Sequence, residues 1–135
     1  MVQTAEQRRL TRLVLAYNKK AGRLGLPGAL SASDLARKPM ECFYCGIGLE
    51  VGQGTFDHVI LFDRGGPNTP DNVVRCCTTC NRTKFNKTPA EFQAHKDLVI
   101  QCEVCGKQYQ PRWGEYINGR ARTCSLSCAA KKRWK

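Results

Sequence analysis

Acidic residues are scarce in this sequence: 11 Asp and Glu stand against 22 Lys and Arg, which gives the 135 residues a net charge of +11. No long apolar run occurs, and residues 1–10 hold no apolar signal region, so the sequence indicates neither a membrane-spanning nor a secreted protein. We therefore expect a cytoplasmic protein. A chain of this length has one small apolar core, so a further source of stability is expected.

Nine cysteines can supply that stability. Eight of them form four closely spaced pairs: Cys42/Cys45, Cys77/Cys80, Cys102/Cys105 and Cys124/Cys128. In a reducing compartment such pairs are typical of tetrahedral zinc sites, because two thiolates from one short turn can reach one ion. Two structural Zn²⁺ ions are predicted, one on the first two pairs and one on the last two. The spacing also permits Cys77/Cys80 to share an ion with Cys102/Cys105, and Cys76 is left as a surplus thiol.

The basic residues are concentrated at the two ends of the chain. Residues 1–40 carry eight Lys and Arg against two acids, and residues 101–135 carry the same numbers, whereas residues 41–100 are nearly neutral. A cationic surface attracts a polyanion such as DNA or RNA, although a merely solvated helix face would have the same composition.

The residue pattern predicts a mixture of short helices and strands. Helices are expected over residues 5–20, where Thr4 and Gln7 can form a capping box, over 33–37, from Thr78 and from Pro89. Residues 55–60 and 73–75 have the composition of strands, separated by a Gly- and Pro-rich loop over 64–70. The central part of the chain is therefore predicted to run strand, loop, strand, helix.

An Asp57-His58 pair lies between the two central cysteine pairs, with Asn72 and Asn81 downstream. If sulfur fills the zinc sites, neither histidine is needed as a structural ligand, and His58 is available as a base. An enzyme that acts on phosphodiesters would need both Asp57 and His58 to face the same phosphate group. Consecutive residues of a regular strand, however, point to opposite faces. We therefore expect the strand to end or twist at this pair, in an enzyme that acts on phosphodiesters.

Residues 42–84 resemble the HNH endonucleases, which have the ββα-metal fold. The residues that carry the resemblance are Cys42-x-x-Cys45, Asp57-His58-Val59-Ile60, Gly65-Gly66, Asp71-Asn72-Val73-Val74 and Cys77-x-x-Cys80-Asn81-x-x-Lys84. The chain departs from the usual form at Leu61, where many members have proline, and at Asn81, where many have histidine. The resemblance implies an α+β protein with an N-terminal helical region (1–38), a zinc-stapled nuclease core (39–98) and a C-terminal zinc ribbon with a basic tail (99–135).

The resemblance also implies catalytic roles. His58 would deprotonate a water for in-line attack on phosphorus, and Asn72 would brace the loop that carries His58. Asp57 and Asn81 would hold one catalytic divalent cation. An amide oxygen in place of imidazole favours Mg²⁺ or Mn²⁺ at that position.

The implied substrate is DNA, which would be nicked or cut. Lys84 would contact a phosphate, with Arg64 and Arg82 as further candidates for nucleic-acid binding. A monomer or weak dimer is expected, with no membrane and no small-molecule cofactor as partner. The compact size and the appended ribbon suggest a protein of a phage or mobile element in a bacterial cell.

Other interpretations remain open at the C-terminal module. Tyr109, Trp113 and Tyr116 favour packing within the ribbon, with stacking on bases as the alternative. His95 has no acidic or cysteine partner at a useful spacing and is expected to be structural. If the zinc ribbons and the basic flanks only bind nucleic acid or protein, the chain is a non-catalytic zinc-binding adaptor. A zinc deaminase is disfavoured because no His-x-Glu accompanies the cysteines.

Overall fold

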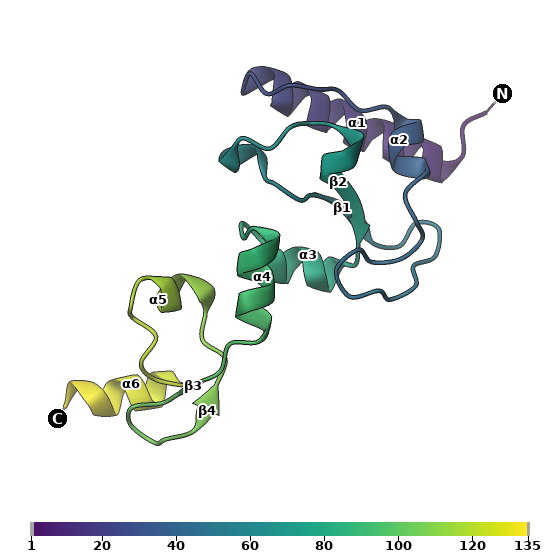
Figure 1. Ribbon diagram of the computed structural model, residues 1–135. Helices are drawn as coiled ribbons and strands as arrows, with labels where there is room; N and C mark the ends of the chain where they lie inside the picture. The colour runs from purple at the N-terminus through teal and green to yellow at the C-terminus, as the bar shows by residue number, and fades with distance from the viewer. Residues whose placement is uncertain (1, 135) are drawn as a thin grey trace. The chain divides into compact units, whose positions relative to one another are not determined.

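The computed structural model describes residues 2–134 and divides into two compact units, Met1–Pro89 and Ala90–Lys135. Short helices and two antiparallel sheets of two strands each make this an α+β protein, which confirms the predicted fold class (Figure 1). Within residues 2–134, no helix has both the length and the apolar character needed to cross a membrane.

The first unit holds the predicted strand, loop, strand, helix segment. Its elements are α1 (Ala5–Arg23), α2 (Ala32–Ala36), β1 (Thr55–His58), η1 (Phe62–Arg64), η2 (Pro70–Asn72), β2 (Val73–Cys76) and α3 (Thr78–Lys84). β1 and β2 pair antiparallel, with His58 opposite Val73. β1 ends at His58, so the expected end of the strand at the Asp57-His58 pair is confirmed.

Helix α1 begins at the predicted capping box. The Thr4 side chain accepts a hydrogen bond from the Gln7 backbone N–H, and the Gln7 side chain accepts one from the Thr4 backbone N–H. The helix continues past its predicted end at residue 20 as far as Arg23. Basic side chains in the last turn complement the negative end of the helix dipole, which favours this extension.

The N-terminal helices and the central strands share one hydrophobic core. Its buried residues are Leu10, Val14, Leu30, Leu35, Phe56 and Val73. Leu10 and Val14 lie one turn apart on α1, so that helix presents an apolar stripe to the sheet. Because side chains alternate along β1, Phe56 and His58 face α1 whereas Asp57 faces α3. Residues of the N-terminal region are therefore integral to the unit that carries the candidate site.

The second unit begins with the helix that starts at Pro89. Its elements are α4 (Pro89–Lys96), β3 (Ile100–Gln101), β4 (Gln108–Tyr109), α5 (Trp113–Ile117) and α6 (Leu126–Arg133). The His95 ring lies 5.6 Å from the Trp113 ring, and His95 Nε2 donates to the Pro111 carbonyl oxygen at 2.8 Å. His95 and Trp113 thus have structural contacts within this unit.

Candidate active site and metal centres

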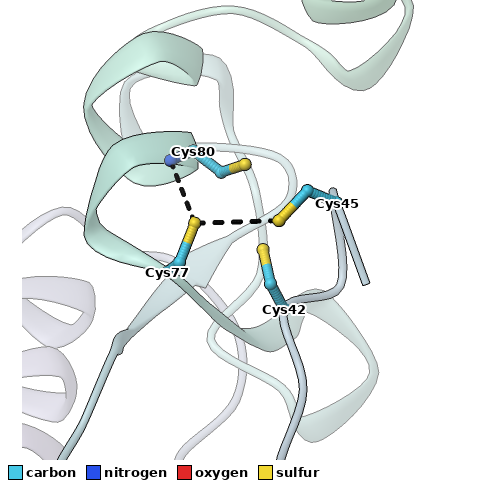
Figure 2. A group of neighbouring side chains, drawn as sticks. All are labelled: Cys42, Cys45, Cys77 and Cys80. Carbon is cyan, nitrogen blue, oxygen red and sulfur yellow. Dashed lines mark hydrogen bonds between the residues drawn. The ribbon is translucent and has the colours of Figure 1, made fainter. Parts of the chain in front are cut away.

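Four cysteine side chains meet where the N-terminal end of α3 lies beside the turn at residues 42–46. Figure 2 shows the sulfur atoms of Cys42, Cys45, Cys77 and Cys80 pointing toward one another. All four sulfur atoms lie within 4.8 Å of one another, and Cys45 Sγ is 3.9 Å from Cys77 Sγ. A zinc ion bound tetrahedrally at about 2.3 Å from each sulfur requires sulfur separations of about 3.8 Å. The residues therefore fit a Zn²⁺ ion.

The second unit repeats this arrangement. Cys102, Cys105, Cys124 and Cys128 bring their sulfur atoms within 4.8 Å of one another. The turns of both clusters are built alike, because the glycine after the second cysteine has a positive φ, 77° at Gly46 and 72° at Gly106. The predicted pairing is confirmed, and the alternative that joins Cys77/Cys80 to Cys102/Cys105 is wrong.

Backbone groups favour the thiolate in each cluster. Burial raises the pKa of Cys42, but N–H groups of Cys77, Cys45 and Tyr44 outweigh it and bring that pKa down to about 6. Backbone hydrogen bonding, foremost from Cys105, also lowers the pKa of Cys102 to about 6. One thiol of each cluster is therefore in the form that zinc binds near neutral pH, whereas burial raises the pKa of Cys80 and the hydrogen bond with Cys105 raises the pKa of Cys124 to about 11. The surplus Cys76 differs: it is fully buried, and burial raises its pKa to about 12.

We expect two zinc ions per chain by elemental analysis of the purified protein. Cys45→Ser and Cys105→Ser should each lower the content to one ion, because three remaining ligands hold zinc far more weakly than four. Cys76→Ser is the matched control and should retain two. A wild-type content of one ion, or a single substitution that removes both ions, would contradict two independent four-cysteine sites.

His58 lies at the end of β1 among aromatic rings. Its imidazole is buried, with 7% of the residue exposed. The ring lies 4.8 Å from that of Tyr17 in a perpendicular arrangement and 4.2 Å from that of Phe62. Nε2 lies 3.0 Å from Oδ1 of Asn68. These contacts hold the ring in one orientation.

The cavity beside His58 has a volume of about 170 Å³ and is also lined by Asp57 and Lys20. Burial lowers the pKa of His58 below its ordinary value of 6.5. The hydrogen bond to Asn68 and the Asp57 charge act in the opposite direction but do not outweigh burial. The imidazole is therefore neutral near pH 7, the state that a base requires.

One carboxylate oxygen of Asp57 contacts protein side chains and the other is accessible. Its Oδ2 atom accepts a hydrogen bond from the Tyr44 hydroxyl at 2.5 Å and pairs with the Lys84 ammonium at 2.9 Å. The Oδ1 atom has no hydrogen-bond partner among residues 2–134 and is not sealed from solvent. One carboxylate oxygen is thus available as a ligand for a hard cation, although the adjacent ammonium weakens its attraction for one.

The position of Lys84 differs from the predicted phosphate contact. The residue is completely buried, its Nζ atom pairs with Asp57, and the same atom lies 3.5 Å from the His58 carbonyl oxygen. A side chain enclosed in this way does not reach a bound polyanion. Lys84 lies on the side of α3 that packs against β1, and its spacing of three residues from Asn81 does not reveal this packing.

Asn72 hydrogen-bonds to backbone atoms of the loop that follows His58. Its Oδ1 accepts from the Ile60 N–H at 2.9 Å, and its Nδ2 donates to the carbonyl oxygens of Ile60 and Pro67 at 2.9 and 2.8 Å. Gly66 completes the brace, because a β-carbon there would lie 1.8 Å from the Ile60 carbonyl oxygen. The loop that follows His58 is therefore tied at several backbone atoms.

The remaining predicted residues lie on or near α3. Asn81 is half-buried on that helix, and it does not belong to the lining of the 170 Å³ cavity. Arg82 is exposed on the same helix. Arg64 is also exposed, and its Nε donates to the Asn86 carbonyl oxygen at 3.1 Å.

Three residues at the site were missed by the sequence interpretation. No role at the site was predicted for Asn68, Lys20 or Tyr44. Lys20 lines the cavity, with its Nζ 5.8 Å from the centre of the Phe62 ring. No local pattern marks these residues, since each reaches the site through a contact with a distant segment.

The segment that carries the first cysteine cluster and His58 is similar to a known protein family. Residues 42–97 match the model of a family of HNH endonucleases. This segment of the chain is therefore similar to HNH endonucleases. The matched segment includes the first cysteine cluster together with His58, Asn72 and Asn81, so the HNH resemblance expected from the sequence is confirmed.

Two known proteins are similar to this chain. The CRISPR-associated endonuclease Cas9 of Corynebacterium diphtheriae is 29% identical over 100 residues, which are 69% of this chain and 9% of that protein. The crystal structure of the Type II-C Cas9 enzyme from Actinomyces naeslundii is 27% identical, covers 67% of this chain and 11% of that one, and has a TM-score of 0.42. The chain thus spans only a small part of the length of either protein.

Proposed function

We propose that this chain is a metal-dependent nuclease that nicks or cuts DNA phosphodiester bonds. The observation that carries the proposal is the cavity that Asp57 and His58 both line, within the segment that matches HNH endonucleases. One side chain offers a neutral nitrogen base and the other a carboxylate oxygen that has no hydrogen-bond partner among residues 2–134. Metal-assisted hydrolysis of a phosphodiester can use a base of this kind together with an oxygen ligand for the cation.

His58 is the base in this proposal. Its neutral imidazole accepts a proton from the attacking water, and burial keeps that nitrogen unprotonated near pH 7. Asn72 is a positioning residue, because its three side-chain hydrogen bonds hold the loop that follows His58. A shift of this loop would move the imidazole relative to the phosphate.

A divalent cation would be held by Asp57 Oδ1 and the side-chain oxygen of Asn81. When bound, Mg²⁺ or Mn²⁺ supplies positive charge that offsets the negative charge developing on the phosphate. Both ligands are oxygens, which suits these hard cations. Lys84 holds the carboxylate in place through Oδ2, so the open oxygen keeps a defined position.

DNA is proposed as the substrate because the chain is strongly cationic and the basic side chain of Lys20 lines the cavity. Lys20 at the rim is a candidate phosphate contact, together with exposed Arg64 and Arg82. We assign the nuclease chemistry to residues 39–98 and substrate holding to the ribbon and basic tail of residues 99–135. One copy of the site nicks one strand, which fits a monomer or weak dimer.

The proposal is tested with zinc-loaded protein and supercoiled plasmid. We expect nicked circles to accumulate when Mg²⁺ or Mn²⁺ is added and none without added divalent cation, because the cavity itself lacks the charge to stabilise the reaction. Labelled single-stranded RNA of matched length serves as the parallel substrate. Plasmid binding without cleavage under every cation condition would instead support the zinc-binding adaptor.

A further inference from the structure

The side-chain amide of Asn18, on α1, has a defined orientation. Its Oδ1 accepts from the Leu30 backbone N–H at 2.9 Å, and its Nδ2 donates to the Leu30 carbonyl oxygen at 3.0 Å. A backbone N–H can only donate and a carbonyl can only accept. The oxygen and nitrogen of Asn18 therefore cannot be exchanged without losing both hydrogen bonds.

This orientation determines that of Asn68. Asn18 Oδ1 has a second contact, with Asn68 Nδ2 at 2.7 Å, and an amide oxygen can only accept. The atom of Asn68 that faces Asn18 must therefore be its NH₂ group. Its oxygen then faces His58, 3.0 Å from Nε2.

The contact with Asn68 in turn determines which nitrogen of the His58 imidazole carries the proton. Because Asn68 Oδ1 can only accept, His58 Nε2 must carry a hydrogen. A neutral imidazole has one N–H, so its other nitrogen, Nδ1, holds the lone pair. Nδ1 has no hydrogen-bond partner among residues 2–134 and is not sealed from solvent. The basic nitrogen is thus the one that remains accessible where His58 lines the cavity.

Asn68 is held firmly enough to transmit this orientation. It is completely buried, and its backbone N–H donates to the Pro27 carbonyl oxygen at 2.9 Å. Gly28 packs so closely that a β-carbon there would lie 2.5 Å from the Asn68 carbonyl oxygen. The segment after α1 therefore clamps the loop that bears Asn68.

We propose that Asn68 and Asn18 are positioning residues that fix the tautomer of His58, with the proton on Nε2 and the basic lone pair on Nδ1. The Leu30 peptide group is the anchor of this chain of hydrogen bonds. The catalytic meaning of the inference rests on the proposed nuclease function, whereas the tautomer itself does not. It also gives the N-terminal region a part in the site besides its basic charge.

The test is a long-range ¹H–¹⁵N correlation spectrum of the histidine side chains in the full, zinc-loaded chain above neutral pH, without added Mg²⁺. Neutral imidazole gives well-separated ¹⁵N shifts for its N–H and lone-pair nitrogens. We expect His58 to show the proton on Nε2. His95, the other histidine, bonds a backbone carbonyl through Nε2 and is the internal reference for that tautomer. A His58 proton on Nδ1 in the wild-type spectrum would overturn the inference.

Two variants extend the test to catalysis. Asn68→Ala and Asn18→Ala should move the His58 shifts toward a mixture of tautomers and leave those of His95 unchanged. With DNA saturating, the single-turnover nicking rate should fall on the order of tenfold to a hundredfold, with little change in the DNA concentration for half-saturation. Unchanged His58 shifts in both folded variants would also overturn the inference. If the wild-type protein shows the expected tautomer but never cleaves, the nuclease proposal fails and the positioning role for a catalytic base fails with it, while the tautomer assignment stands.

Discussion

Plasmid nicking by the His58→Ala variant is expected to be about 10²–10⁴-fold slower than that of the wild type. The variant loses the neutral nitrogen that accepts the proton of the attacking water. DNA affinity should change little, because His58 is buried and phosphate binding depends on exposed basic side chains. The nicking rate is measured under single-turnover conditions with Mg²⁺, and binding is measured separately without it.

His95→Ala is the matched control, since it removes the other histidine of the chain. It should retain the wild-type nicking rate, because His95 contacts Trp113 and Pro111 in the second unit. Equal losses in the two variants would point to a general effect on folding. A His58→Ala protein that nicks at the wild-type rate would exclude the imidazole as the base.

The pH dependence of nicking gives a further check on the same group. Burial lowers the pKa of His58, so the neutral, active form persists below the ordinary value of 6.5. The nicking rate should therefore fall with decreasing pH only below 6.5, and a fall that begins above that value would contradict the role of burial. Zinc content is measured at each pH, because protonated thiols release zinc.

Replacement of Lys84 by methionine should lower the free energy of unfolding by about 3–5 kcal/mol. The substitution keeps the apolar stem but removes the ammonium that pairs with Asp57, whose side chain is 7% exposed. A buried carboxylate would remain with the Tyr44 hydroxyl as its hydrogen-bond donor. Urea denaturation of the zinc-loaded protein measures the loss.

Two controls separate this effect from a general loss of positive charge. Arg82→Met removes an exposed charge from the same helix and should change stability by no more than about 0.5 kcal/mol. The double variant Asp57→Asn with Lys84→Met should recover part of the loss, since it leaves no unpaired charge. If Lys84→Met costs no more than Arg82→Met, the ion pair does not stabilise the fold.

Several features of this protein were predictable because neighbouring residues in the sequence create them. Each cysteine pair sits in one short turn, and the glycine that permits the turn stands next to it, as at Gly46. The capping box needs only Thr4 and Gln7, three residues apart. The resemblance to HNH endonucleases implied that Asn72 braces its loop, and Asn72 hydrogen-bonds to the backbone of Ile60 and Pro67.

Contacts between distant segments could not be predicted from neighbouring residues in the sequence. Lys84 has the same spacing from Asn81 whether it faces a phosphate or an internal carboxylate, so the pattern could not reveal that α3 packs on β1 and buries it. Likewise Asn18 and Asn68 are 50 residues apart and become neighbours only when α1 lies against the sheet. Features formed within one turn, such as the cysteine pairs and the capping box, can therefore be predicted from the sequence. The pairing of Lys84 with Asp57 and the position of the proton on His58 depend on which distant segments the fold brings together.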